Sequence, residues 1–149
     1  MVVERMDRLL VDTNIFGIAV DKQDSRRASV WKTLSKVAFG ERELFVASIV
    51  IEEIKKNPHK ITMKKELELV ENLVSKTFGF TLEAKQLAGV LEEKAGLGVV
   101  DAQIVAVAIV NDLVFWSGDR RILRAKTLED INNLLSRENL HYSFRFKKE

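Results

Sequence analysis

A short apolar run followed by an acid and an amide is the feature that most constrains the fold. The run Leu9–Val11 contains no polar residue, and Asp12-Thr13-Asn14 follows it directly. Such a run with polar flanks is typical of a strand that is buried on both faces of a parallel sheet. In open α/β sheets, ligands bind at the carboxyl ends of these strands. Asp12 is therefore a candidate site residue, although Asp and Asn are also ordinary turn residues.

The length of 149 residues predicts one domain over residues 1–149. A chain of this size buries a large core without disulfide or metal crosslinks. A single proline, seven glycines and the absence of repeats argue against disordered linkers.

The chain has no cysteine, which excludes disulfides, zinc–thiolate sites and a thiol nucleophile. The N-terminal residues lack the apolar core of a signal peptide. The most apolar segment, Val99–Val110, is too short to span a bilayer. We therefore expect a soluble cytoplasmic protein without a membrane partner.

The charged residues nearly balance, because 24 Lys and Arg stand against 22 Asp and Glu, for a formal net charge of +2. This excess favours a polyanionic partner only weakly. The placement of the charges is more informative than their sum.

Apolar residues at helical spacing predict four helices in the first two thirds of the chain. Capping residues and helix breakers set their bounds at Arg26–Ala38, Ile49–Lys56, Thr62 to Leu73 or Val74, and Thr81 to a stop at Gly96. Ser48 is expected to cap the second of these helices, and Gly17–Asp24 is expected to be a loop. The short apolar segment Leu44–Ala47 predicts another strand.

The last third of the chain predicts two further strands and two helices. Val99–Asn111 is both β-branched and rich in alanine, and its length favours a buried helix that begins at Asp101. Leu113–Trp116 is a strand between polar turns, and Thr127 begins a sequence like a capping box. Apolar and polar residues alternate over Leu140–Phe146, as in a half-exposed strand at a sheet edge. Strands that alternate with helices predict a layered α/β fold.

Four acids occupy equivalent places in these elements. Asp12 and Asp119 each follow a strand. Glu53 lies in the helix after the second strand, and Asp101 opens the buried helix. The carboxyl ends of parallel strands share one edge of a sheet, so we expect the four carboxylates to meet in one pocket. Each acid also has a plainer interpretation as a helix cap, a turn residue or an exposed helix position.

Carboxylates that share a dry pocket raise one another's pKa unless a cation compensates their charge. Oxygen ligands without cysteine, and with only His59 and His141 as histidines, select Mg²⁺ or Mn²⁺ over zinc or copper. One or two such ions orient a water and stabilise the charge of a phosphoryl transition state. The residues therefore predict phosphodiester hydrolysis.

The segments that carry the acids resemble the successive motifs of PIN domains, the metal-dependent ribonucleases that include VapC-type toxins. The resemblance rests, in the family's motif order, on Leu9–Asn14, Ser48–Ile54, Asp101–Ala108 and Ser117–Asp119. It implies a three-layer α/β/α sandwich with a central mainly parallel sheet, to which Leu140–Phe146 adds a C-terminal edge strand. It also implies Mg²⁺ or Mn²⁺, an RNA substrate, a homodimer and, for a toxin, an antitoxin protein as partner.

The acids that match the family's metal site are Asp12, Glu53, Asp101 and Asp119. Glu53 is preferred to its neighbour Glu52 because the family's acid usually precedes Leu or Ile, as Glu53 precedes Ile54. We expect Asp12 and Asp101 to bind the principal ion, while Glu53 and Asp119 position its waters or a second ion.

Two neutral residues, Asn14 and Ser117, match the family's supporting polar positions and are expected to hold a carboxylate or a water in place. Arg120 and Arg121 directly follow Asp119 and are predicted to bind substrate phosphates. A second basic group lies beyond Glu53 and consists of Lys55, Lys56, His59, Lys60, Lys64 and Lys65. This basic group suits RNA contact, and simple solvation of a helix face is the alternative.

Two other functions start from the same residues. A catalytically inactive PIN-like module that binds RNA or protein would keep the fold and the basic surface and use the acids structurally. A phosphatase with Asp12 as its nucleophile would call for a second Asp two residues later, where this chain has Asn14.

Overall fold

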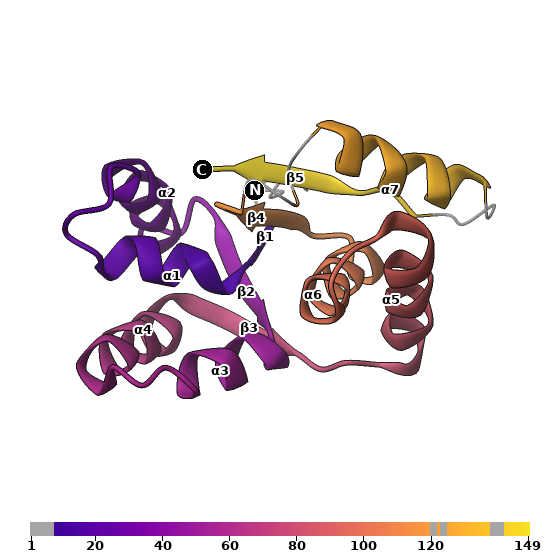
Figure 1. The fold of residues 1–149 in the computed structure, drawn as a ribbon. Coiled ribbons are helices and arrows are strands. Elements are labelled where there is room, and N and C mark those ends of the chain that lie inside the picture. The colour runs from indigo at the N-terminus through magenta and orange to yellow at the C-terminus, as the bar shows by residue number, and fades with distance from the viewer. Residues whose placement is uncertain (1–7, 120–121, 123–124, 138–141) are drawn as a thin grey trace.

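The computed structural model describes residues 8–119, 122, 125–137 and 142–149. Its centre is a five-stranded sheet with the order β3-β2-β1-β4-β5 (Figure 1). The strands are β1 (Arg8–Val11), β2 (Glu43–Ala47), β3 (Val74–Phe78), β4 (Val114–Ser117) and β5 (Arg145–Lys148). Each strand pairs with its neighbours in parallel.

Parallel strands need crossover connections, and helices provide them here. The helices are α1 (Thr13–Val20), α2 (Arg27–Ala38), α3 (Ser48–Lys55), α4 (Lys60–Leu73), α5 (Leu82–Ala95), α6 (Val99–Val110) and α7 (Ala125–Arg137). In Figure 1, α1, α2 and α4 lie on one side of the sheet, and α5 and α6 lie on the other. The predicted three-layer α/β/α sandwich with a parallel sheet and a C-terminal edge strand is confirmed.

The strand order reverses at β1. From β1 the chain passes to β2 and β3, and it then returns to place β4 on the opposite side of β1. Ligands of open α/β sheets bind at such a reversal, outside the carboxyl ends of the strands. Asp12 directly follows β1 and Ser117 ends β4, so both residues stand at this point.

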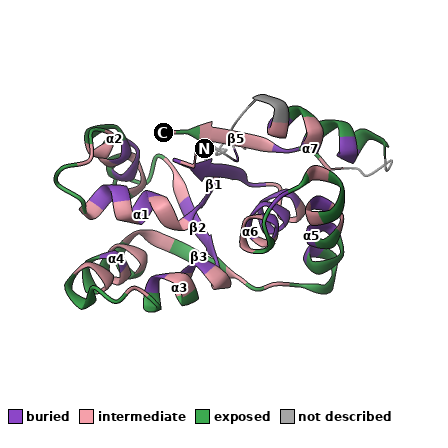
Figure 2. Ribbon diagram, viewed as in Figure 1, coloured by how far each residue is buried: buried purple, intermediate pink, exposed green. Residues whose placement is uncertain are grey.

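The neighbouring strands β1 and β4 are the most deeply buried part of the sheet (Figure 2). Leu9–Val11 and Val114–Trp116 have no exposed surface, which confirms the prediction drawn from their apolar runs. Helix α6 is apolar on nearly every side because Ala102 and the segment Ile104–Ile109 are buried. None of the described helices is long and apolar enough to cross a membrane.

The prediction of a loop over Gly17–Asp24 is wrong in its first half, because α1 extends to Val20. Asp12 is the N-cap of α1, and its side chain accepts a hydrogen bond from the backbone N–H of Thr13. The helix packs its apolar side chains inward, with Ile15, Phe16, Ile18 and Ala19 buried. One aspartate therefore ends a strand and starts a helix.

Strand β3 has no counterpart in the sequence prediction, in which the preceding helix ends at Leu73 or Val74. That helix, α4, ends at Leu73. Ser75, Lys76 and Thr77 are exposed at the edge of the sheet, so β3 has neither an apolar run nor an alternating pattern.

Several predicted boundaries are also wrong. Ala47 is the N-cap of α3, and Ser48 is its first residue rather than its cap. Helix α6 begins at Val99 with Gly98 as its N-cap, and α7 begins two residues before Thr127.

The predicted strand Leu140–Phe146 is displaced toward the C-terminus. Its first two residues, 140 and 141, lie outside the described residues, and β5 begins only at Arg145. Phe144 precedes β5 and is buried against Phe115, with a distance of 6.0 Å between ring centroids.

Glu149 attaches β5 to β4 and α2. Its backbone N–H donates to the carbonyl oxygen of Ser117 over 3.1 Å. Its carboxylate accepts hydrogen bonds from the indole N–H of Trp116, at 3.2 Å, and from the hydroxyl of Ser29. Lys147 lies 3.5 Å from the same carboxylate, whose side chain is only 1% exposed.

We expect Glu149→Ala to lower the free energy of unfolding by about 1–3 kcal/mol, because it leaves the buried Trp116 N–H without its acceptor. Glu149→Gln keeps an acceptor oxygen and should lose less. Urea unfolding followed by tryptophan fluorescence measures both changes, with Glu52→Ala on an exposed helix position as the control. Equal stability of the Ala and Gln variants would contradict this account.

Candidate active site

The carboxylate of Asp12 lies at the meeting point of β1 and β4 and is 5% exposed. Its backbone N–H donates to the carbonyl of Trp116 over 2.9 Å, which continues the pairing of the two strands. Its Oδ1 accepts the N–H of Thr13 at 2.8 Å. Its Oδ2 accepts the hydroxyl of Ser117 at 2.8 Å and the amide of Asn14 at 3.3 Å. Both carboxylate oxygens are therefore held by neutral donors.

Asn14 and Ser117 belong to one hydrogen-bond network with the turn after β4. The Asn14 Nδ2 also donates to Ser117 Oγ at 3.3 Å, and its Oδ1 accepts the N–H of Gly118 at 3.0 Å. Ser117 Oγ in turn accepts the backbone N–H of Asp119 at 2.9 Å. The structure thus places both predicted supporting residues in contact with Asp12 and with the turn that carries Asp119.

Gly118 packs so closely that a side chain there would collide with its surroundings. A Cβ atom at this position would lie 2.8 Å from Ile18 Cδ1 and 3.0 Å from Arg26 Nη1. Arg26 also donates to the Gly118 carbonyl over 3.1 Å and forms an ion pair with Asp24 at 3.0 Å. Sequence reasoning missed Arg26 and Asp24, because their link to the turn is a tertiary contact.

Glu53 reaches the site through Thr13, whose hydroxyl donates to Glu53 Oε1 over 2.6 Å. Glu52 is exposed on the same helix. Of the two acids, Glu53 is therefore the one that contacts a neighbour of Asp12, and its role in the site stays a prediction. The role of Thr13 was not predicted, although a hydroxyl residue between Asp12 and Asn14 was a visible signal.

Burial raises the pKa of Asp12 from 3.8 to about 6. This pKa includes smaller opposing contributions: the hydrogen bonds from Ser117 and Thr13 lower it, and the negative charges of Asp101 and Glu53 raise it. Glu53 and Asp101 are therefore both close enough to Asp12 to act on it electrostatically.

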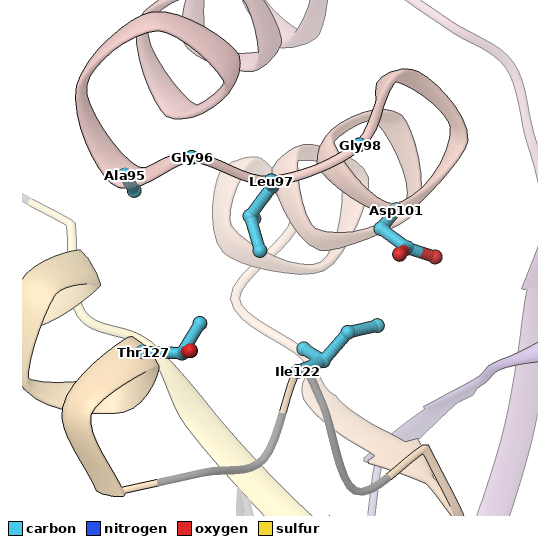
Figure 3. A pocket seen from close by; sticks show the side chains of 7 residues that line it. All are labelled: Ala95, Gly96, Leu97, Gly98, Asp101, Ile122 and Thr127. Carbon is cyan, nitrogen blue, oxygen red and sulfur yellow. The ribbon is translucent and has the colours of Figure 1, made fainter.

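Asp101 and Asp119 are half-buried. Asp101 lies in the first turn of α6 and lines a cavity of about 270 Å³ (Figure 3). Asp119 follows the turn after β4, where its backbone is bound to Ser117. Arg120, Arg121 and His141 lie outside the described residues.

The donor set fits a hard divalent cation, because every predicted ligand is a carboxylate oxygen. A cation would also stabilise the ionised form of Asp12, whose pKa is raised mainly by burial and to a smaller extent by the charges of Asp101 and Glu53. Among the described residues, no three His, Asp or Glu side chains stand in a ready coordinating group. The side chains would therefore have to adjust when an ion binds.

The basic group beyond Glu53 is exposed throughout, at the end of α3, the following loop and the first turns of α4. Its described members are Lys55, Lys56, His59, Lys60, Lys64 and Lys65. Their exposure fits either RNA contact or simple solvation.

The raised pKa of Asp12 makes its charge a cost to the folded state. The raised pKa means that the Asp12 carboxyl group stabilises the folded state when it is protonated. This stabilisation is complete below the unfolded pKa of 3.8 and is lost as the pH rises through about 6. The cost at neutral pH is about 3 kcal/mol.

We therefore expect Asp12→Asn to be more stable than the wild type by about 2 kcal/mol at pH 8 without divalent ions, after about 1 kcal/mol is lost with the Ser117 hydrogen bond. At pH 4 this advantage should vanish. Urea unfolding at both pH values in EDTA measures the difference, and Asp21→Asn at an exposed position is the control. An advantage that is independent of pH would refute the assignment.

In a comparison with protein families, the model of the PIN domain family matches residues 9–128. Comparison with curated proteins gives no match.

Solved structures share the fold. VapBC2 from Rickettsia felis, bound to a DNA fragment from their promoter, aligns with a TM-score of 0.64 and 17% identity, covering 95% of this chain and 98% of that chain. A toxin–antitoxin complex from Klebsiella pneumoniae aligns with a TM-score of 0.62 and 16% identity, covering 80% of this chain and 93% of that chain. FitAcB from Neisseria gonorrhoeae aligns with a TM-score of 0.59 and 15% identity, covering 83% of this chain and 92% of that chain. At these identities the likeness concerns the fold alone.

Proposed function

The chain belongs to the PIN domain family, and on this premise we propose that it is a Mg²⁺- or Mn²⁺-dependent endoribonuclease. One observation carries the proposal. A buried carboxylate, Asp12, stands at the reversal of the strand order under the influence of the negative charges of Glu53 and Asp101. Such a cluster is costly for the fold alone and suits a site that binds a cation.

Asp12 and Asp101 would hold the principal ion, and Glu53 and Asp119 would hold its waters or a second ion. When bound, the metal supplies Lewis-acid stabilisation of the phosphoryl charge. Ser117 and Asn14 fix the orientation of Asp12, and Thr13 fixes Glu53. Glu53 or Asp119 accepts the proton of the attacking water as a general base. Arg120 and Arg121 bind the phosphates of the substrate.

The proposed substrate is RNA, and the proposed setting is the cytoplasm, with the chain acting as a homodimer. The Klebsiella pneumoniae structure of the same fold is a toxin–antitoxin complex. We extend this kind of partnership to the present chain and propose that it is a toxin whose antitoxin covers the acidic site.

A second candidate is a catalytically inactive PIN-like module that binds RNA or protein. The observation in its favour is that the described acids do not form a ready coordinating group of three. Metal-dependent turnover separates the two functions, because only the nuclease cleaves RNA.

We expect Asp12→Asn to reduce Mg²⁺- or Mn²⁺-dependent cleavage of generic RNA by about 100-fold or more, because the variant loses a ligand charge at the reacting centre. The circular dichroism spectrum should be unchanged. Asp21→Asn keeps full activity as the matched control. Wild-type turnover by Asp12→Asn would exclude the proposed site, and metal-dependent release of phosphate from a small ester without RNA cleavage would favour a phosphatase.

We also expect the paired change Lys55→Ala and Lys56→Ala to weaken RNA binding at low salt. If both residues contact phosphates, the slope of log affinity against log salt should fall by about 1.4, at about 0.7 per contact with single-stranded RNA. Fluorescence anisotropy over a salt series measures this slope. The paired change Lys32→Ala and Lys85→Ala removes the same charge from exposed positions on α2 and α5 and is the control. An unchanged slope would mean that Lys55 and Lys56 are solvated at the helix end and do not contact RNA.

A further inference from the structure

A cavity of about 270 Å³ opens beside Asp101. Its walls come from the connection between α5 and α6, the first turn of α6, and two residues from later in the chain, Ile122 and Thr127 (Figure 3). The lining residues are Ala95, Gly96, Leu97, Gly98, Asp101, Ile122 and Thr127. Asp101 is one of the four proposed metal-site acids, so the cavity adjoins the proposed catalytic site.

We infer that this cavity is a base-binding subsite, which receives the nucleobase of a nucleotide next to the scissile phosphate of a single-stranded RNA. The inference rests on the proposed ribonuclease function, and it adds where the substrate is held and which part of it is recognised.

The size of the cavity suits one base. Its volume lies just below the range of about 300–1,000 Å³ that is usual for sites of drug-sized ligands. A single flat ring system therefore fits better than a larger ligand. Gly96 and Gly98 in the α5–α6 connection have no side chain, so a ring in the cavity is able to approach the backbone there closely.

The lining also has the chemistry of a base site. Leu97 and Ile122 are nearly buried and, as Figure 3 shows, the side chain of Leu97 extends toward Ile122 and Thr127. Apolar side chains offer the faces of a base a surface for contact. The hydroxyl of Thr127 and the carboxylate of Asp101 add polar groups at the wall. A carboxylate in the wall disfavours a phosphate as occupant, because like charges repel.

Gly98 provides the test. Its φ of −63° and ψ of 161° suit any L-residue, and a Cβ atom there would meet only Asp101 Oδ2, at 3.9 Å. Gly98→Thr therefore narrows the cavity without backbone strain. Threonine is about as good an N-cap as glycine, so the start of α6 is preserved. Gly79→Thr is the matched control, because Gly79 is also exposed, has an open Cβ position and lies outside the cavity lining.

Binding is measured by fluorescence anisotropy in EDTA with the Asp12→Asn variant, so that no cleavage occurs. The probes are a short single-stranded RNA and a set of copies with one abasic position each. We expect one abasic position to weaken binding by about tenfold, the order of a lost base contact. Gly98→Thr should cause a similar loss with the intact RNA and should make the protein insensitive to that abasic position, whereas Gly79→Thr should change neither.

The two changes are coupled only if the base occupies the cavity. If the protein is equally sensitive to every abasic position with and without the Gly98→Thr change, the inference is overturned. If Gly98→Thr abolishes the binding of a protein partner and leaves RNA binding unchanged, the cavity belongs to that partner and the inference is also overturned. If the coupling is found but the wild type cleaves no RNA with Mg²⁺ or Mn²⁺, the subsite stands and the proposed catalytic function fails. If the wild type cleaves RNA with Mg²⁺ or Mn²⁺ but no coupling is found, the proposed catalytic function stands and the subsite is excluded.

Discussion

The structure depends on how the Asp12 carboxylate is held between β1 and β4. Every contact that we find on it comes from a neutral donor: the Thr13 N–H on one oxygen, and the Ser117 hydroxyl and Asn14 amide on the other. These hydrogen bonds stabilise the ionised form but do not offset its burial, because the pKa remains raised to about 6. The same residue also pairs with Trp116 through its backbone, so the central strands and the charged group are one unit.

The order of the strands explains why this unit is formed from distant parts of the chain. Asp12 and Ser117 are separated by 105 residues, yet they are neighbours because β4 returns to the free side of β1. Helix α1 begins directly after β1 with Thr13, and Asp101 in the first turn of α6 is close enough to influence the pKa of Asp12. Gly118 allows the turn after β4 to pack against Ile18 and Arg26, which fixes the turn that leads to Asp119.

The elements that are buried on both faces were predictable, because burial leaves an apolar run in the sequence. Leu9–Val11, Leu44–Ala47 and Leu113–Trp116 all lie in or next to strands of the observed sheet. β3 was missed because its side chains face solvent at the sheet edge, and α1 was missed because its only start signal, Asp12, had been assigned to the site. In the site, Asn14 and Ser117 both donate hydrogen bonds to Asp12, and their supporting role stays a prediction. Arg26 and Gly118 act through contacts that leave no local pattern in the sequence.

Asp12 shows why a residue of this kind has two interpretations in a sequence. As an N-cap it satisfies a backbone N–H of α1, and any Ser, Thr or Asn would do the same without a charge. A neutral cap would also avoid a cost of about 3 kcal/mol at neutral pH. Capping therefore does not account for a carboxylate at this position, and neither do the neutral donors around it. The negative charges of Asp101 and Glu53 add to this cost, so an ionised Asp12 is unfavourable for the folded state alone.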